Sequence, residues 1–390
     1  MAADEALSSR APGQVRVVVG MSGGVDSSVT ALLLKRRGFD VRGAYMLNWD
    51  PQEEDEHGRC RADEDFADAK KICTQLQIPL HKVEFIREYW SDVFTPSMAA
   101  YEAGHTPNPD VMCNREIKFK RFLHLCQSRF QADYIATGRL YLMRGADATK
   151  DQSYFLSNTT GDALKRTLFP VGHLTKTEVK EMAKEAGWGW LTEKKSSAGI
   201  CFIGKRNFSR FVDKYIPPTA GFFHSLDGTV LGKHEGMTKY TIGQRARIPG
   251  RLDANKLYVV DKSVENNSVT VAEGADHPAL LTDSLYASDV HWISGTPQAL
   301  RAGEALACEY QVGHLRAPAP CQVEPLQPAN GEATDAAGQY RVQFSIDRTV
   351  APHQVVAFYQ GQLCLGGGLI QKAGPSYWDQ HKPVPAHWTI

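Results

Sequence analysis

Hydrophobic positions in the first two hundred residues follow two alternating periods. Short apolar runs predict four strands, at Val15 to Val19, Val41 to Met46, Leu80 to Phe85 and Asp133 to Thr137. Between the strands, apolar residues recur at helical spacing, first in a segment that Gly38 would end as a C′ residue. Asp63 is a candidate N-cap of the next helix. This alternation indicates an α/β fold with a parallel sheet covered on both faces.

The pattern changes after about Gly204. Before that point, Thr175 and Glu178 fit a capping box that opens a helix ending at Gly187. Beyond it, a short amphipathic helix is followed by short predicted strands, at residues 257–261, 268–272, 285–292, 340–346 and 355–359. We therefore expect a disordered tail over residues 1–14, an α/β domain over 15–205, a small central domain over 206–283 and a β domain over 284–390.

Composition narrows the classes of function. Lys plus Arg and Asp plus Glu number 44 each, so an RNA-binding surface must come from local clusters of cations. No apolar run approaches the roughly 20 residues that span a bilayer, which argues against a membrane protein. No two of the eight cysteines form a C-x-x-C pair, so we assign no metal site. Each cysteine is then either a buried apolar filler or a reactive thiol.

A glycine-rich loop lies between the first predicted strand and helix. It comprises Gly20, Met21, Ser22, Gly23, Gly24, Val25, Asp26, Ser27 and Ser28. Glycines let the backbone present N–H groups, and the following helix N-terminus favours an anion, so the loop predicts phosphate binding. It has no Lys before its Ser and is therefore not the loop of phosphoryl-transfer ATPases.

The S-G-G-x-D-S pattern of this loop resembles the N-type ATP pyrophosphatases, which cleave ATP between the α and β phosphates. That resemblance implies adenylation of a substrate oxygen, with AMP and pyrophosphate as products. The loop by itself does not choose among the members of that family, which include amide-forming ligases and tRNA thiolases.

Two cysteines have surroundings that favour a thiolate. Cys113 follows the proline-rich segment Thr106 to Asp110 and is predicted to lie beside a helix N-terminus. Cys201 lies in a flexible loop with Lys194 and Lys195 nearby, whose charge would lower its pKa.

Five motifs in one order resemble the tRNA-specific 2-thiouridylases from about Val15 to Pro375. They are S-G-G-V-D-S, N-P-D-V-M-C-N, K-D-Q-S-Y-F-L, G-I-C-F-I-G and Y-T-I-G-Q-R. The resemblance implies an ATP-pyrophosphatase domain, a central domain and a β-barrel-like C-terminal domain. It makes Gly20 to Ser27, Met46 and Gly138 the ATP site, and Cys113 and Cys201 the nucleophile and the persulfide carrier. It places tRNA contacts at Asn108, Pro109, Asp110, Lys150, Asp151, Gln152, Gln244, Arg245 and Gln354.

A chemical route follows from these roles. A uridine C2 carbonyl is a poor electrophile, so ATP, with Mg²⁺ as its companion, would first adenylate the oxygen. A persulfide on Cys201 then attacks C2, and Asp110 is placed in sequence to manage a proton. Attack by Cys113 on the carrier sulfur would release the thiolated base and leave a disulfide. The expected partners are tRNA, an upstream persulfide donor fed by a cysteine desulfurase, and a thiol reductant, with no membrane.

The sequence also departs from the family pattern. Gly138 is followed directly by Arg139 to Asp147, where the family has a longer excursion that contains a histidine. Gln311 and Val312 replace an Arg-aromatic pair that contacts tRNA. The shortened segment leaves open a tRNA-binding variant with impaired catalysis. Another adenylating ligase of the same loop family is the second alternative, and the two placed cysteines count against it. The tract around Asn48 to Cys60 resembles organellar members, which favours a mitochondrion over the bacterial cytoplasm as the location.

Overall fold

A five-stranded parallel sheet forms the first part of the fold in the computed structural model, which describes residues 11–50, 61–137, 151–194, 207–250, 256–326, 338–348 and 350–386. Its strands are β1 (Arg16–Gly20), β2 (Asp40–Leu47), β3 (Leu80–Glu84), β4 (Tyr134–Ala136) and β5 (Thr167–Leu168). They lie in the order β3-β2-β1-β4-β5. The four predicted strands and their parallel pairing are confirmed. β5 was not predicted, because two residues are too few to show a period.

Helices cover both faces of this sheet. On one face, Val17 and Val19 pack against α2 (Val25–Arg36), α3 (Arg61–Gln75) and α10 (Lys176–Glu185). Val18 points the other way, because side chains alternate along a strand, and joins a core that includes Ile117 and Phe122. That second core is built on α4 (Ile86–Tyr89), α5 (Thr95–Glu102), α6 (Pro109–Met112), α7 (Phe122–Phe130) and the π-helical stretches η3 (Trp90–Phe94) and η4 (Cys113–Arg121).

Helix ends test the predicted caps. Gly38 and Gly187 have φ angles of +85° and +79°, as C′ residues require, and the capping box between Thr175 and Glu178 is complete. The prediction for Asp63 is wrong, because α3 begins at Arg61 and Asp63 lies in its first turn, where a carboxylate still complements the helix dipole. Pro12–Gln14, predicted as part of a disordered tail, form a 3-10 turn before β1. The other short helices are α8 (Ser153–Leu156), α9 (Gly161–Lys165), α11 (Gly189–Glu193) and α12 (Phe208–Val212).

The central part of the chain folds into a second five-stranded sheet. Its order is β7-β6-β10-β9-β8, with β6 (Gly221–His224), β7 (Val230–His234), β8 (Arg245–Ala246), β9 (Leu257–Ser263) and β10 (Ser268–Glu273). The predicted pair of strands at 257–261 and 268–272 is confirmed as the antiparallel hairpin β9-β10, with Asn267 at a positive φ of 45° in the turn.

The C-terminal strands close into a barrel. Its order is β11-β14-β13-β12-β15-β16, with β11 (Leu281–Trp292), β12 (Leu306–Val312), β13 (Ala319–Pro325), β14 (Tyr340–Arg348), β15 (Val355–Gln360) and β16 (Leu363–Ala373), and with the short helix α13 (Gln298–Arg301) outside it. Closure pairs every strand on both sides and leaves no exposed edge. The expected β-barrel-like domain is therefore confirmed, and its first strand begins a few residues before the predicted start at Ser284.

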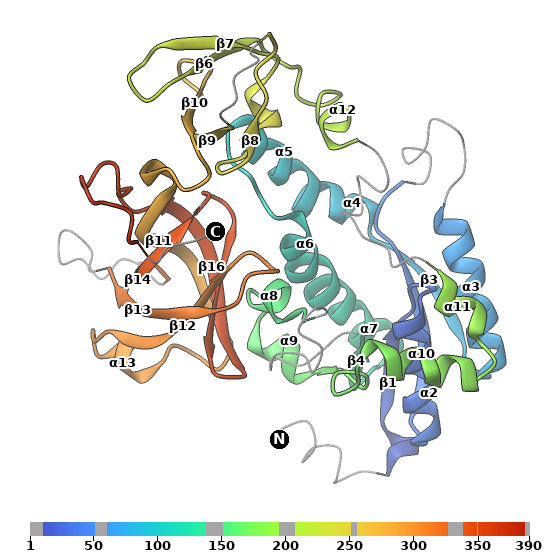
Figure 1. Ribbon diagram of the computed structural model, residues 1–390. Helices are drawn as coiled ribbons and strands as arrows, with labels where there is room; N and C mark the ends of the chain where they lie inside the picture. Colours follow the sequence, from blue (N-terminus) through green and yellow to red (C-terminus); the bar gives the residue numbers. More distant parts are fainter. Residues whose placement is uncertain are drawn as a thin grey trace.

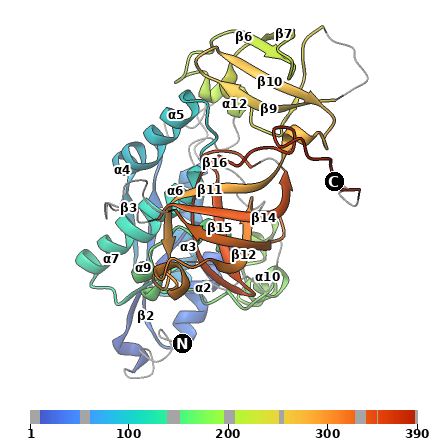
Figure 2. The same ribbon diagram turned by 90° about the vertical axis from the view of Figure 1, so that its left-hand side faces the viewer.

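The three parts surround one column of helices. Figure 1 shows α5, α6 and α7 running between the parallel sheet and the barrel, with the central sheet at the α5 end of the column. The view turned by 90° shows the same three bodies, with the barrel beside α6 and α9 (Figure 2). The segment that contains Cys113 therefore lies where the α/β part faces the barrel. No helix in the described part of the chain is long and apolar enough to cross a membrane.

Candidate active site

The phosphate loop lies at the switch point of the parallel sheet. β1 is flanked by β2 and β4, and the chain runs outward on both sides, so the carboxyl ends of β1 and β4 form a crevice of the kind that binds ligands in open α/β sheets. Gly20 ends β1, and a Cβ on it would lie 3.4 Å from Cε of Met46. The predicted neighbours Gly20 and Met46 are thus brought together, while Gly138 lies outside the described residues.

Serine hydroxyls hold the loop in shape. The Ser22 N–H donates to Oγ of Ser27 (3.2 Å), and the Ser27 hydroxyl donates to the carbonyl of Gly24 (3.1 Å). Gly23 has a φ of +70°, and a Cβ there would stand 2.3 Å from the carbonyl oxygen of Asp65, so only glycine fits. Gly24 offers no side chain to cap α2, so no side-chain cap satisfies the first backbone N–H groups of that helix in the described structure. Ser27 is buried, so it belongs to the core as well as to the loop.

Asp26 is held by a residue from a distant helix. Lys176, the first residue of α10, donates from Nζ to Oδ1 of Asp26 at 2.5 Å, and both side chains are about one-quarter to one-third exposed. Sequence reasoning missed Lys176, because 150 residues separate the pair and no local pattern marks it. Thr137 was missed as well. It follows β4 at the same crevice, and among the described residues its buried hydroxyl has no hydrogen-bond partner.

The N-P-D residues form the beginning of a helix. Asn108 is the N-cap of α6, its side chain accepts from the Val111 N–H at 3.3 Å, and Pro109 occupies the first helical position. Asp110 follows in the first turn. Burial of the Tyr101 hydroxyl raises the pKa of that group, and the nearby Asp110 charge raises it further. The motif therefore has a structural reason to contain these residue types, and it presents the Asp110 carboxylate beside Tyr101.

Cys113 lies deeper than its neighbours in sequence suggest. α6 continues without a break into η4, so Cys113 is the fifth helical residue and not a residue beside the N-terminus. The expectation of a thiolate favoured by the helix dipole loses its basis, since that effect fades within the first turn. The side chain is 1% exposed. π-helical segments such as η4 are frequent at functional sites, which keeps Cys113 a candidate.

The second motif packs directly against the first. The amide of Asn114, the residue after Cys113, donates to the carbonyl of Phe155 at 3.1 Å. Asp151 accepts from both the N–H and the hydroxyl of Ser153 and so opens α8, with Gln152 as the residue before the helix. Asn114 was not predicted as a site residue, although its place directly after Cys113 in the motif could have indicated it.

The remaining predicted contacts lie in the other two parts of the chain. Gln354 donates from Nε2 to the carbonyl of Thr106 at 2.6 Å, so it is joined to the N-P-D segment. Oε1 of Gln244 accepts from the Thr241 N–H within its own turn, and Arg245 is exposed on β8. Cys201, Lys150, Lys205, Arg206 and residues 139–147 lie outside the described residues.

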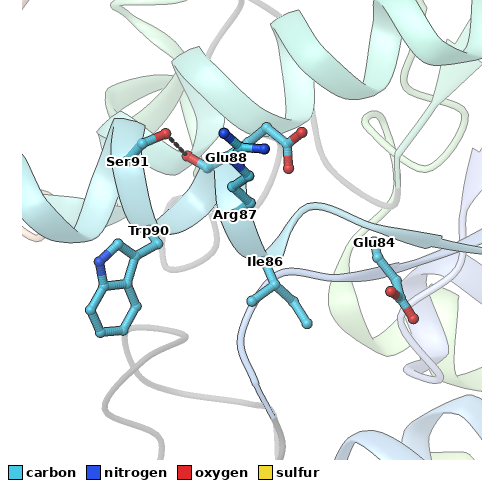
Figure 3. A pocket seen from close by; sticks show the side chains of 6 residues that line it. All are labelled: Glu84, Ile86, Arg87, Glu88, Trp90 and Ser91. Carbon is cyan, nitrogen blue, oxygen red and sulfur yellow. Dashed lines mark hydrogen bonds between the residues drawn. The ribbon is translucent and has the colours of Figure 1, made fainter.

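A hollow in the described part of the chain lies away from this site. It measures about 660 Å³ and lies beside the sheet-edge strand β3, lined by Glu84, Ile86, Arg87, Glu88, Trp90 and Ser91 (Figure 3). No predicted site residue lines it. A second hollow of about 530 Å³ lies between η4, α9 and β11 and includes Arg115, Asn158 and His291 among its lining residues.

Comparisons with known proteins cover almost the whole chain. Residues 15–205, 209–273 and 282–370 match the families described as "tRNA methyl transferase HUP domain", "tRNA methyl transferase PRC-barrel domain" and "Aminomethyltransferase beta-barrel domain". The "tRNA-specific 2-thiouridylase MnmA" of Idiomarina loihiensis is 43% identical over 372 residues, which is 92% of this chain and 96% of the relative. The "tRNA-specific 2-thiouridylase MnmA 2" of Geobacillus kaustophilus is 44% identical over 384 residues, which is 95% of this chain and 99% of the relative.

The similarity runs through all three parts of the fold and leaves few residues of either relative uncovered. The resemblance drawn from the five motifs is confirmed by it. On this identity and coverage, the chain belongs to the tRNA-specific 2-thiouridylase family.

Proposed function

We propose that this chain is a tRNA-uridine 2-sulfurtransferase that uses ATP to replace the C2 oxygen of the wobble uridine with sulfur. One observation supports it beyond family membership. The segment of Cys113 and the K-D-Q-S-Y-F segment, which are apart in sequence, are joined by the hydrogen bond from Asn114 to Phe155. An adenylating ligase that uses ammonia or an amino acid as its nucleophile needs neither of these segments, and it needs no buried cysteine such as Cys113.

The loop residues would bind ATP at the switch point. Backbone N–H groups of Gly20 to Ser27 and the N-terminus of α2 would hold its phosphates, while Met46 and Gly138 border the nucleotide. The Asp26 carboxylate would bind a Mg²⁺ ion carried by those phosphates. For this, the Lys176 ammonium would leave Asp26 and pair with a phosphate instead. Adenylation then converts the C2 oxygen into a leaving group, and pyrophosphate departs.

Sulfur would follow in two steps. The terminal sulfur of a Cys201 persulfide attacks C2 and expels AMP, and the Cys113 thiolate then attacks Sγ of Cys201. This second attack frees the thiolated base and joins the two cysteines in a disulfide, which a thiol reductant reopens. Because Cys113 is 1% exposed, the side chains that cover it must part before it can reach Cys201. Asp110, one turn earlier, would take up a proton in this exchange.

Further parts of the proposal concern the surroundings of the reaction. A cysteine desulfurase relay would load Cys201, and the tRNA would contact Asn108 to Asp110, Lys150 to Gln152, Gln244, Arg245 and Gln354. We propose functional units over residues 15–205, 206–283 and 284–390 and a mitochondrial location, with the bacterial cytoplasm as the alternative.

One assay separates this function from the alternatives. Purified protein is given ATP, unmodified tRNA, a ³⁵S persulfide donor and a thiol, and both pyrophosphate and tRNA-bound label are measured. The proposed function requires both products. Pyrophosphate without label indicates another ligase, and tRNA binding without either product indicates a variant that has lost catalysis.

Binding to tRNA is expected to weaken with salt. Each phosphate contact should contribute roughly −0.7 to −0.9 to the slope of log K against log salt concentration. Arg245→Gln should reduce the magnitude of that slope by about one such contribution, because Arg245 is exposed and no ion pair joins it to the described residues. Arg36→Gln, at the end of α2 opposite the phosphate loop, is the matched control and should not change the slope. Affinity that is insensitive to salt would contradict the prediction.

A further inference from the structure

Residues 104–108 are the place where all three parts of the fold meet. On the central side, the hydroxyls of Thr106 and Thr241 lie 3.4 Å apart, and a Cβ on Gly104 would stand 3.0 Å from Cγ2 of Val264. On the barrel side, Gln354 donates to the carbonyl of Thr106. The segment ends at Asn108, the N-cap of α6, so whatever holds it also sets where that helix begins.

A pair of stacked imidazoles forms the second barrel contact. The rings of His105 and His353 are 3.9 Å apart between centroids and inclined by 10°. Burial lowers the pKa of both imidazoles, and the neighbouring His353 and Lys262 lower that of His105 further, which favours the neutral form that a close face-to-face stack needs. His353 and Gln354 are adjacent in sequence, and they contact the adjacent residues His105 and Thr106.

The backbone of His353 has a strained conformation, and its ring stacks on His105 from that conformation. His353 has a φ of +64°, a conformation that costs a non-glycine residue about 1–2 kcal/mol. Hydrogen bonds to β16 hold it there, from the His353 N–H to the carbonyl of Ile370 (2.7 Å) and from the Ile370 N–H to the carbonyl of Gln354 (2.8 Å). Strain of this kind persists only where the surroundings over-determine it.

The barrel also packs directly on helix α6. Val111, which follows Asp110, is buried in one cluster with Val355, Ala357 and Tyr359 of β15. The same strand accepts at the carbonyl of Val355 from the Tyr154 hydroxyl (2.9 Å), and Tyr154 belongs to the K-D-Q-S-Y-F segment. β15 and the turn before it therefore hold both segments that flank Cys113.

We infer that His353 and Gln354 are positioning residues for the thiolation reaction. They fix residues 105–108 and thereby the register in which α6 presents Asp110 and Cys113. The inference rests on the proposed function, since it assigns these two residues to the same site. The Gln354 side chain thereby has a partner within the protein, in addition to the tRNA contact proposed for this residue.

Glycine at position 353 separates positioning from stability. His353→Gly removes the stacked ring but relieves the strained φ, so its melting temperature should stay close to that of the parent. We expect kcat for tRNA thiolation to fall roughly tenfold while KM for tRNA changes less than about threefold, a reduction in barrier stabilisation of about 1.4 kcal/mol. The matched control is Gln131→Gly, which relieves a φ of +53° at the end of α7, away from these contacts, and should keep the parental kcat.

Two more variants test the individual contacts. Gln354→Ala should lower kcat in the same direction, and His105→Phe, which keeps a flat ring for stacking, should retain more activity than His105→Ala. Parental kcat in both His353→Gly and Gln354→Ala would overturn the inference, as would losses that fall entirely on KM for tRNA. Cys113→Ser in the same assay keeps the two proposals distinct. If that variant thiolates tRNA normally, the proposed site is wrong. If Cys113→Ser is inactive while His353→Gly and Gln354→Ala are fully active, only the positioning role is refuted.

Discussion

Cys113→Ser is expected to accept sulfur label on Cys201 and to pass none of it to tRNA as released 2-thiouridine. Its hydroxyl cannot attack the carrier sulfur as a thiolate does, so the last step of the exchange stops. Cys201→Ser should fail earlier, because no persulfide forms and no label stays on the protein. Incubation with a ³⁵S persulfide donor, followed by separation of protein and tRNA under non-reducing conditions, measures both steps.

A third cysteine supplies the control for this pair. Cys126 lies on α7, the continuation of the Cys113 helix, and is completely buried, which raises the pKa of its thiol. Cys126→Ser should lower the melting temperature, since it places a hydroxyl in an apolar core, yet leave both labelling steps intact. Label that resides on Cys113, or normal thiolation by both serine variants at positions 113 and 201, would refute the relay.

Asp26→Ala and Ser27→Ala are expected to reduce tRNA-dependent pyrophosphate release by about a hundredfold, the scale seen when a preorganised contact to developing charge is removed. Asp26→Ala leaves Lys176 without its carboxylate partner beside the phosphate loop. Ser27→Ala removes the hydroxyl that joins Ser22 to Gly24, so the loop loses its shape. Pyrophosphate release at saturating ATP, measured beside thermal melting, tests both variants.

Ser28→Ala distinguishes a loop defect from general destabilisation. The Ser28 hydroxyl is fully buried and donates to the same Gly24 carbonyl at 2.9 Å, so its loss should cost a similar, modest amount of stability, about 1 kcal/mol. Unlike the Ser27 hydroxyl, the Ser28 hydroxyl is not joined to Ser22 in the described structure, so pyrophosphate release should persist. Normal release in the Asp26 and Ser27 variants would show that ATP binds elsewhere.

The elements that the sequence predicted well are those set by neighbours in the chain. The capping box at Thr175, the glycine C′ residues and the β9-β10 hairpin depend on spacings of a few residues, which a local pattern records. The glycine loop after β1 also follows from local chemistry, because a turn with positive φ needs glycine. Where the pattern was too short, as in β5, or ambiguous, as at Asp63, the prediction failed.

The five motifs by themselves determined the family and the candidate residues of this protein, because each is a local string of residues. Only the tertiary structure decided how they meet. Three features arise only when separately formed faces dock. They are the burial of Cys113 inside a continuous helix, the ion pair of Lys176 with Asp26, and the contacts of His353 and Gln354 with residues 105–106. Thr106 and Gln354 stand 248 positions apart, and a hydrogen bond across that separation imposes no period on the residues between them. Local sequence patterns therefore cannot predict such contacts.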